Sequence, residues 1–255
     1  MQLSATLALG DQQQEDIQET IIRYKSAIGI NPNNPETRLK LGRAYLMSGD
    51  MDNAAEQFRA AIKLAPKNAE GEYGLARVMM RKGEFQVAHD SIATCIRLDP
   101  NNAEYHFKFG QILTRQANND EAIKEFRQAI KLKPDLAGAH RDLGALLGMK
   151  GDLDGEIFEE KKAAELQDPD AYYFLGDAYA GKDDRTNAIQ SLRKCTQLDP
   201  KNALAFRLLA GVLAANHQFP EAIKSAEAAV HLEPDNKSFK NTLNKIRAAY
   251  EKAGR

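Results

Sequence analysis

Tryptophan is absent from the 255-residue sequence, and only two cysteines occur, Cys95 and Cys195. Two thiols are too few for the disulfide framework of a secreted protein, so we expect a reducing compartment and place the chain in the cytoplasm. The 35 Lys and Arg residues are balanced by 36 Asp and Glu. Because the basic excess of a nucleic-acid-binding protein is missing, we expect no nucleic-acid partner.

Long apolar runs are missing as well. The N-terminal segment MQLSATLALG is mildly apolar, but the first basic residue is Arg23, whereas a secretory signal starts with a cationic segment. No stretch approaches the ~18 apolar residues of a membrane-spanning helix. The sequence therefore predicts no membrane insertion.

Complete catalytic motifs are also lacking. The stretch HRDLG at 140–144 begins like the catalytic loop of a protein kinase, in which the aspartate accepts a proton from the substrate hydroxyl. That loop requires an Asn five residues after the Asp, and this sequence has Leu147 there. A kinase also needs a glycine-rich phosphate loop, yet G-x-G occurs nowhere among the seventeen glycines. We therefore reject Asp142 as a catalytic base.

Other isolated signals have the same weakness. Ser191 and Lys194 match S-x-x-K without its companion motifs. His106 and His140 are one interval of 34 residues apart, but two histidines without a third ligand make a poor metal site. We therefore expect no enzymatic activity, no cofactor and no metal.

Prolines, in contrast, recur at an interval of 34 residues, in one run from Pro32 to Pro134 and again from Pro200 to Pro234. Amphipathic segments such as AAEQFRAAIKL precede them, with apolar residues at the i, i+3, i+4 and i+7 spacing of one helix face. Turn-forming residues fall halfway between prolines, so each unit predicts a helix, a turn, a second helix and a loop. The prolines are Pro32, Pro66, Pro100, Pro134, Pro200 and Pro234, and the turn residues are Gly49, Gly83, Gly151 and the pair Asn118 and Asn119.

This pattern resembles the tetratricopeptide repeat. Six units in phase carry it over nearly the whole chain, and the resemblance implies an all-α fold, a right-handed α-solenoid of stacked antiparallel helix pairs. The family's tryptophan at the fourth position is missing; Arg38, Glu72, His106, His140, Tyr172 and Phe206 stand there. In the first complete unit the seventh, eighth, eleventh, twentieth, twenty-fourth, twenty-seventh and thirty-second positions are Leu41, Gly42, Tyr45, Ala54, Phe58, Ala61 and Pro66.

In this register the isolated motifs become packing residues. His140, Leu143 and Gly144 of HRDLG occupy the fourth, seventh and eighth positions, and Cys95 and Cys195 the small twenty-seventh position. We expect both cysteines to be buried structural thiols.

The expected organisation has three parts. A degenerate repeat covers 1–34, with a full second helix over about 17–28 behind a short first one. Six repeats follow at 35–68, 69–102, 103–136, 137–168, 169–202 and 203–236, and a capping helix occupies 237–255.

The unit at 137–168 departs from the pattern. Glu156 takes the small twentieth position and Glu160 the aromatic twenty-fourth, and the unit is two residues short. Either solenoids tolerate such a slip, or the chain has a flexible joint between 1–155 and 169–255, in which case the amides of 156–167 exchange faster than those of other second helices.

The resemblance implies a concave surface, lined by the first helix of each pair, that binds an extended peptide or a partner protein. We therefore expect a non-enzymatic scaffold or adaptor that assists complex assembly. Arginine forks suit carboxylates and aromatic rings suit apolar side chains, so the expected partner is an acidic extended peptide with one or two apolar residues. The candidate peptide-binding residues, which point away from the packing positions, are Arg43, Tyr73, Arg77, Arg81, Phe107, Gln111, Arg115 and Arg141.

Three alternatives stay open. The arginines could simply be solvated and neutralised by Glu36, Glu70 and Glu104 on the same surface. The chain could be a regulatory or substrate-binding domain of a larger enzyme. It could also self-assemble into a homo-oligomer through the N-terminal repeat, if the apolar face of Ile17, Ile21 and Ile28 is left open.

Overall fold

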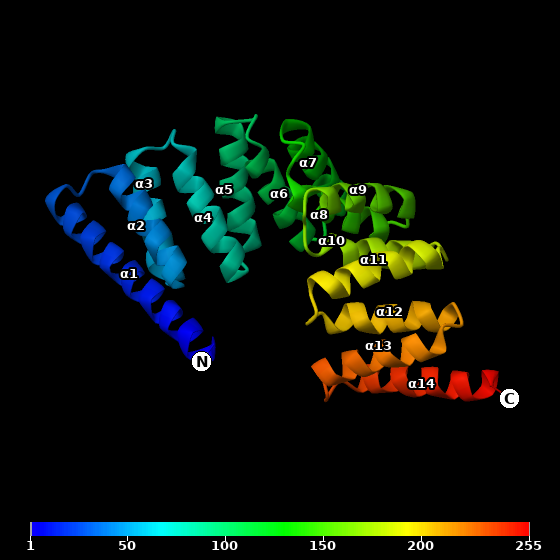
Figure 1. Cartoon of the computed structure of the whole chain (residues 1–255). Coiled ribbons are helices and arrows are strands. Elements are labelled where there is room, and N and C mark those ends of the chain that lie inside the picture. Colours follow the sequence, from blue (N-terminus) through cyan, green and yellow to red (C-terminus); the bar gives the residue numbers. More distant parts are fainter. Residues whose placement is uncertain (1, 255) are drawn as a thin grey trace. The chain divides into compact units, whose positions relative to one another are not determined.

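The fold is all-α. The computed structural model describes the backbone of residues 2–254 and the side chains of residues 15–254, and these residues form fourteen α-helices and no strand (Figure 1). The helices are α1 (Gln2–Ile30), α2 (Pro35–Ser48), α3 (Met51–Leu64), α4 (Ala69–Lys82), α5 (Phe85–Leu98), α6 (Ala103–Arg115), α7 (Asn119–Leu132), α8 (Ala137–Met149), α9 (Leu153–Glu165), α10 (Ala171–Gly181), α11 (Arg185–Leu198), α12 (Ala203–Ala215), α13 (Phe219–Leu232) and α14 (Lys237–Ala253).

The chain divides into two compact units, unit 1 at residues 1–132 and unit 2 at residues 133–255. Unit 1 contains α1 and the pairs α2–α3, α4–α5 and α6–α7, and unit 2 contains α8–α9, α10–α11, α12–α13 and α14. One helix pair falls within each of the six expected repeats.

The division differs from the joint suggested by the irregular unit at 137–168. It lies before α8 and not within 156–168, and α9 packs against both α8 and α10. The two missing residues do not fall in the α8–α9 pair, because α10 begins 34 residues after α8, as α8 does after α6. They are absorbed in α10, which has 11 residues where α8 and α12 have 13. Gln167 adopts a left-handed conformation with φ 64° after α9.

Asparagines start the first helices of the pairs in unit 1. The side chain of Asn34 accepts a hydrogen bond from the backbone N–H of Thr37 at 3.1 Å, and Asn68 and Asn102 cap α4 and α6 in the same way. Such a cap satisfies one of the unpaired N–H groups of the first helical turn. The NPNNPE, APKNAE and DPNNAE segments are therefore helix-start signals.

A left-handed residue closes the turn inside every helix pair. Three of these residues are glycines, which reach positive φ without strain, and three carry side chains. They are Gly49, Gly83, Ala117, Gly151, Asp183 and His217.

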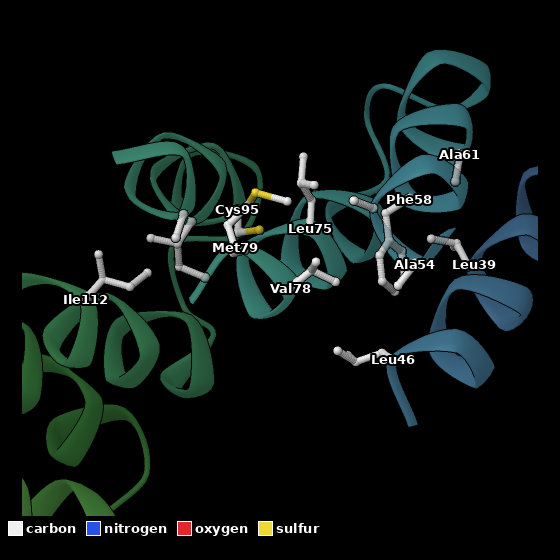
Figure 2. Packing of buried hydrophobic residues seen from close by; sticks show 14 of the residues in the cluster. Leu39, Leu46, Ala54, Phe58, Ala61, Leu75, Val78, Met79, Cys95 and Ile112 are labelled. Atoms are coloured by element: carbon white, nitrogen blue, oxygen red, sulfur yellow. The ribbon is translucent and has the colours of Figure 1, made fainter. Parts of the chain in front are cut away.

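The core of unit 1 is built around Phe58 on α3. Its ring is buried and lies against Gly42 of α2 and Gly74 of α4, where a Cβ atom would collide with it. Figure 2 shows the surrounding cluster, to which Leu39 and Leu75 also belong. Small residues on the first helices thus let a large ring fill the space between successive pairs.

The fourth repeat position is a polar link in place of a tryptophan. In unit 1, Arg38 Nε donates a hydrogen bond to the carbonyl oxygen of Pro32 at 3.0 Å, and its Nη1 donates to Gln57 Oε1 at 3.1 Å. The side chain therefore ties the loop before α2 to the second helix of the pair.

His140 makes the same link in unit 2. Its Nε2 lies 3.0 Å from the carbonyl oxygen of Pro134, and its Nδ1 lies 2.6 Å from a carboxylate oxygen of Glu159. His106 repeats this geometry in unit 1 at 2.9 and 2.6 Å. A carbonyl and a carboxylate both accept hydrogen bonds, so at His140 the geometry favours a ring that is protonated on both nitrogens.

Helix α1 differs from the expected degenerate pair. It is one continuous helix of 29 residues, without a break at Gly10. Its Ile17, Ile21 and Ile28 pack with Leu41 and Ala44 of α2. This apolar face is therefore covered within unit 1, which removes the open surface that the self-assembly hypothesis required.

Unit 2 is closed at its C-terminal end by α14. Its buried Phe239, Leu243 and Ile246 pack onto the preceding pair, and polar residues occupy its other side. The helix covers the apolar surface of α12–α13, as expected for a cap.

Candidate functional site

A cavity of about 350 Å³ opens on the first helices of unit 1. The helices α2, α4 and α6 supply most of its walls, and the buried Phe58 of α3 and Gly74 of α4 also line it. The cavity is lined by Arg43, Phe58, Glu70, Tyr73, Gly74, Arg77, Asn102, Glu104 and Tyr105.

The two carboxylates of the cavity are engaged. Arg43 Nη2 donates to Glu70 Oε2 at 2.7 Å, between α2 and α4. Tyr73 Oη donates to Glu104 Oε1 at 3.0 Å, between α4 and α6. Burial, followed by the charge of Glu104, raises the pKa of the Tyr73 phenol above its usual range, so it stays a hydrogen-bond donor.

Arg77 is the unpaired cation of the cavity. It is exposed, its Cζ lies 5.9 Å from the centre of the Tyr73 ring, and it forms no ion pair with a described residue. The Tyr105 ring lies 5.3 Å from that of Tyr73 in a tilted arrangement. The cavity therefore offers one unpaired guanidinium beside two phenol rings.

The predicted arginines fall into different states. Arg43 is paired as above, and Arg81 Nη1 donates to the carbonyl oxygen of Leu46 at 3.0 Å. Arg115 is exposed in the last turn of α6, without an ion pair to a described residue. The neutralisation that we considered for all of them is thus found at Arg43 and not at Arg77 or Arg115.

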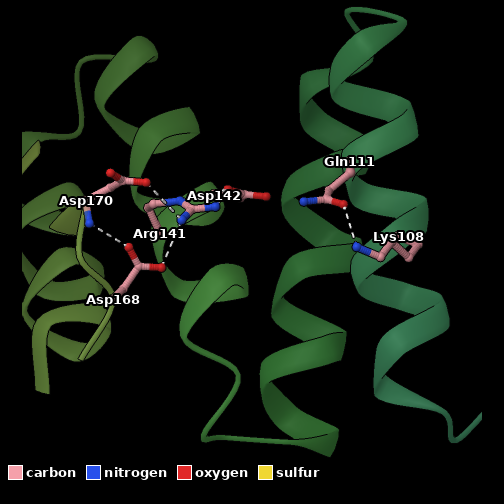
Figure 3. A network of polar contacts seen from close by, with 6 residues as sticks. All are labelled: Lys108, Gln111, Arg141, Asp142, Asp168 and Asp170. Atoms are coloured by element: carbon pink, nitrogen blue, oxygen red, sulfur yellow. Dashed lines mark hydrogen bonds and ion pairs between the residues drawn. The ribbon is translucent and has the colours of Figure 1, made fainter. Parts of the chain in front are cut away.

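Arg141 lies in unit 2, whereas the other four predicted arginines lie in unit 1. Only those four can therefore be described as one surface. Figure 3 shows Arg141 between three carboxylates. The nearest distances are 2.9 Å to Asp168, 3.2 Å to Asp142 and 3.5 Å to Asp170. Asp142 of the HRDLG stretch is therefore an ion-pair partner of the residue before it.

Phe107 corrects the sequence prediction. We expected its ring on the binding surface, but only 8% of the residue is exposed and the ring packs 6.0 Å from that of Phe126. The fifth repeat position faces the neighbouring helices, as the burial of Leu39 also shows. Gln111 remains at the surface and accepts a hydrogen bond from Lys108 at 3.2 Å.

Tyr105 was missed by sequence reasoning. It occupies the third position of its repeat, which carries no family signal, and its ring reaches the cavity only because α6 packs against the preceding pair. In the sequence, only its spacing of 32 residues from Tyr73 indicates that the two rings could lie close together.

The thiols and histidines are structural. Burial raises the pKa of Cys95 to about 12 and that of Cys195 to about 11, so both stay protonated and unreactive. Within the described residues no group of three or more His, Cys, Asp or Glu side chains is placed to hold a metal ion. His106 and His140 instead use both ring nitrogens in the loop links.

Models of the tetratricopeptide repeat match residues 12–56, 45–107 and 169–202, and a TPR repeat model matches residues 110–151. This chain is a tetratricopeptide-repeat protein. The tetratricopeptide-repeat assignment agrees with the all-α helix pairs and with the repeat register read from the sequence. No curated protein sequence is significantly similar to this tetratricopeptide-repeat chain.

Solved structures share the tetratricopeptide-repeat fold. The match to the APC/C hetero-tetramer Cut9-Hcn1 has a TM-score of 0.72 at 18% identity and covers 91% of this chain but only 46% of the matched chain. PilF of Pseudomonas aeruginosa gives a TM-score of 0.72 at 19% identity, covering 84% of this chain and 96% of its own. MamA gives 0.57 at 29% identity, covering 62% and 92%.

No helix among the described residues combines the length and the apolar character needed to cross a membrane.

Proposed function

We propose that this tetratricopeptide-repeat protein is a non-enzymatic scaffold that binds an extended segment of a partner protein on the first helices of unit 1. The observation that carries the proposal is the cavity of about 350 Å³ with the unpaired Arg77 at its wall. YrrB, with a TM-score of 0.59 at 22% identity over 71% of this chain and 95% of its own, is described as a TPR protein with an unusual peptide-binding site. At that identity the likeness concerns the fold, and the proposal rests on the cavity.

The charges of the cavity favour an acidic partner segment. Glu70 pairs with Arg43, and Glu104 pairs with Lys108 at 3.7 Å and accepts the hydrogen bond from Tyr73, so the charges of both carboxylates are compensated within the protein. Arg77 keeps a free guanidinium, whose planar fork suits a carboxylate. Arg115 on α6 offers a second site for a carboxylate on the following pair.

The rings favour an apolar side chain beside the acidic one. Tyr73 and Tyr105 present ring faces in the cavity wall, and Tyr73 is held in place by its hydrogen bond to Glu104. Tyrosine supplies contact area with little loss of side-chain freedom. A segment in which acidic and apolar residues alternate fits both features.

A defined probe tests this proposal. We would titrate the full chain with a short labelled peptide built from Glu, Leu and Gly, and with its Lys, Leu and Gly counterpart, by fluorescence anisotropy. The acidic peptide should bind preferentially. The double variant R77E/R115E should lose about 2–5 kcal/mol of binding free energy if both charges are desolvated in the complex.

The control is Arg59→Glu on α3, which makes the charge change of one of these two substitutions at an exposed residue outside the cavity. Its affinity should stay near that of the natural protein. Binding should also weaken as salt shortens the Debye length from about 10 to about 3 Å. Equal affinities of R77E/R115E and R59E, with no salt dependence, would contradict the site.

The cytoplasm stays the proposed compartment. The two cysteines are free and buried in this structure, which is compatible with a reducing environment.

A further inference from the structure

Two carboxyl groups lie inside the α8–α9 pair of unit 2. Glu160 on α9 is 0% exposed, and Glu156, one turn earlier, is 8% exposed. Neither carboxyl oxygen of Glu160 has a hydrogen-bond partner among the described residues. Buried acidic groups without a partner are rare in folded proteins, so this arrangement calls for a physical explanation.

Both glutamates occupy positions that other repeats fill with apolar residues. Glu160 corresponds to Phe58 and Phe126, and Glu156 corresponds to alanines such as Ala54. On α8, glycines leave room for them: a Cβ at Gly144 would lie 2.9 Å from Glu160 Oε1, and a Cβ at Gly148 would collide with the carboxyl of Glu156.

The surroundings of the two carboxyls are mainly acidic. Arg141 is the nearby cation, and it is already shared by Asp142 and Asp168. On α9 itself Glu159 bonds His140, while Lys162 pairs with Glu165 at 2.8 Å. The charged groups that act on the two carboxyls are therefore Arg141 and Asp142 on α8, Asp168 in the following loop, and Asp177 on α10.

Burial of an ionised carboxylate in this place would cost free energy that no nearby partner compensates. Burial of the neutral acid costs much less. We propose that Glu156 and Glu160 form a proton-binding site whose occupation holds α9 against α8 and α10, and whose emptying loosens α9. The site takes protons as its ligand, because the described residues provide no third coordinating group for a metal ion.

The pKa values of both glutamates are shifted upward, as this geometry requires. Burial raises the pKa of Glu160 to about 9, and the charges of Glu156 and Asp168 add to the effect. Burial and the charge of Asp177 raise the pKa of Glu156 to about 7. Because both values lie above those of an unfolded glutamate, the closed form is favoured at low pH, and its advantage is lost as the pH rises through them.

Hydrogen exchange resolved by helix tests the proposal on the full chain. The range from pH 6 to pH 8 lies below the folded pKa of Glu160. Within it, each increase of one pH unit should raise the opening equilibrium constant of α9 by about tenfold through Glu160. A rise of up to about 100-fold is therefore expected after correction for the intrinsic exchange rate. Helix α11 of the same unit, which carries no buried acid, should change much less.

The variant Glu160→Gln keeps the shape of the neutral acid and cannot ionise. It should lose most of the pH dependence of α9, whereas Glu165→Gln, an exposed residue of the same helix, should keep it. Equal pH dependence of α9 and α11 in the natural protein, or an unchanged pH dependence in E160Q, would overturn the proposal.

A second measurement works even if E160Q fails to fold. The carboxyl carbon of Glu160, assigned in the natural protein by nuclear magnetic resonance, should report a protonated group at pH 7. Titration of this carbon in the ordinary range of glutamate would show that the site does not hold a proton at neutral pH, which rejects the proposal.

Discussion

The pairs α2–α3 and α8–α9 place different side chains at the same structural position. In α2–α3 the ring of Phe58 lies against Gly42, and in α8–α9 the carboxyl of Glu160 lies against Gly144. Both pairs close, with a glycine on the first helix and a buried side chain on the second. The small residue thus permits the close approach of the helices, and the large residue decides how strongly and under which conditions the pair is held.

Truncation of the central residue should separate the two pairs most clearly. Phe58→Ala should lower the free energy of unfolding by about 3–5 kcal/mol, since a buried ring is removed and a cavity remains. Glu160→Ala should cost far less at neutral pH, because the lost packing is offset by removal of a desolvated acid. Urea unfolding followed by circular dichroism measures both, and equal losses would contradict the contrast.

A methyl group added to the glycine on the first helix of each pair should produce a smaller difference in stability between the two pairs. A Cβ would lie 2.9 Å from Phe58 at Gly42 and 2.9 Å from Glu160 at Gly144. Gly42→Ala should destabilise by about 1–3 kcal/mol, because the rigid ring is fixed on both sides by Gly42 and Gly74.

Gly144→Ala should be nearly neutral. The end of the Glu160 side chain can rotate away, and alanine favours the helix by up to about 1 kcal/mol over glycine. Thermal unfolding of the two variants side by side provides the measurement. A larger loss for Gly144→Ala would mean that the carboxyl is held as rigidly as the ring.

The polar links made by His140 in α8–α9 and by Arg38 in α2–α3 should show the smallest difference between the pairs. Each should contribute on the order of 1 kcal/mol to the free energy of unfolding. Burial opposes protonation of His140, but its hydrogen bonds to Glu159 and to the Pro134 carbonyl outweigh burial and raise its pKa. The stability from this link is therefore present below the ordinary histidine pKa and is lost as the pH rises through the raised value. Arg38 makes the same link in unit 1 with a group that stays charged.

Variants at these two positions test that difference. His140→Gln should flatten the pH dependence of unfolding between pH 6 and 8, with Glu160 present in both proteins. Arg38→Gln should lower stability by a similar amount at every pH in that range. An identical pH profile for the natural protein and H140Q would show that the ring does not titrate there.

The fold could be predicted because its signals are local. The 34-residue interval, the asparagine caps and the turn residues each act within one helix pair, so the expected pairs and the structural roles of Cys95 and His140 followed from the register. Gly10 alone could not indicate a second helix, since one glycine weakens a helix without ending it. The single α1 was therefore missed.

The candidate site was predicted only in part, because it depends on contacts between repeats. Arg77 and Arg115 could be named from their positions, but the burial of Phe107 and the pairing of Arg43 with Glu70 are decided by the neighbouring helix pair. The repeat register gives the direction of a side chain on its own helix. It does not give the distance to side chains on the next pair.

The left-handed turns show how small the energetic difference between glycine and another residue can be at such a position. Ala117, Asp183 and His217 adopt the conformation that glycine provides at Gly49 and Gly83. A side chain in this conformation is unfavourable by about 1–2 kcal/mol, but it also restricts the unfolded chain by about 0.4–1 kcal/mol relative to glycine, so the net difference is small. A change of residue at one of these turns should therefore alter the stability of its helix pair only slightly, whether or not the turn carries a glycine.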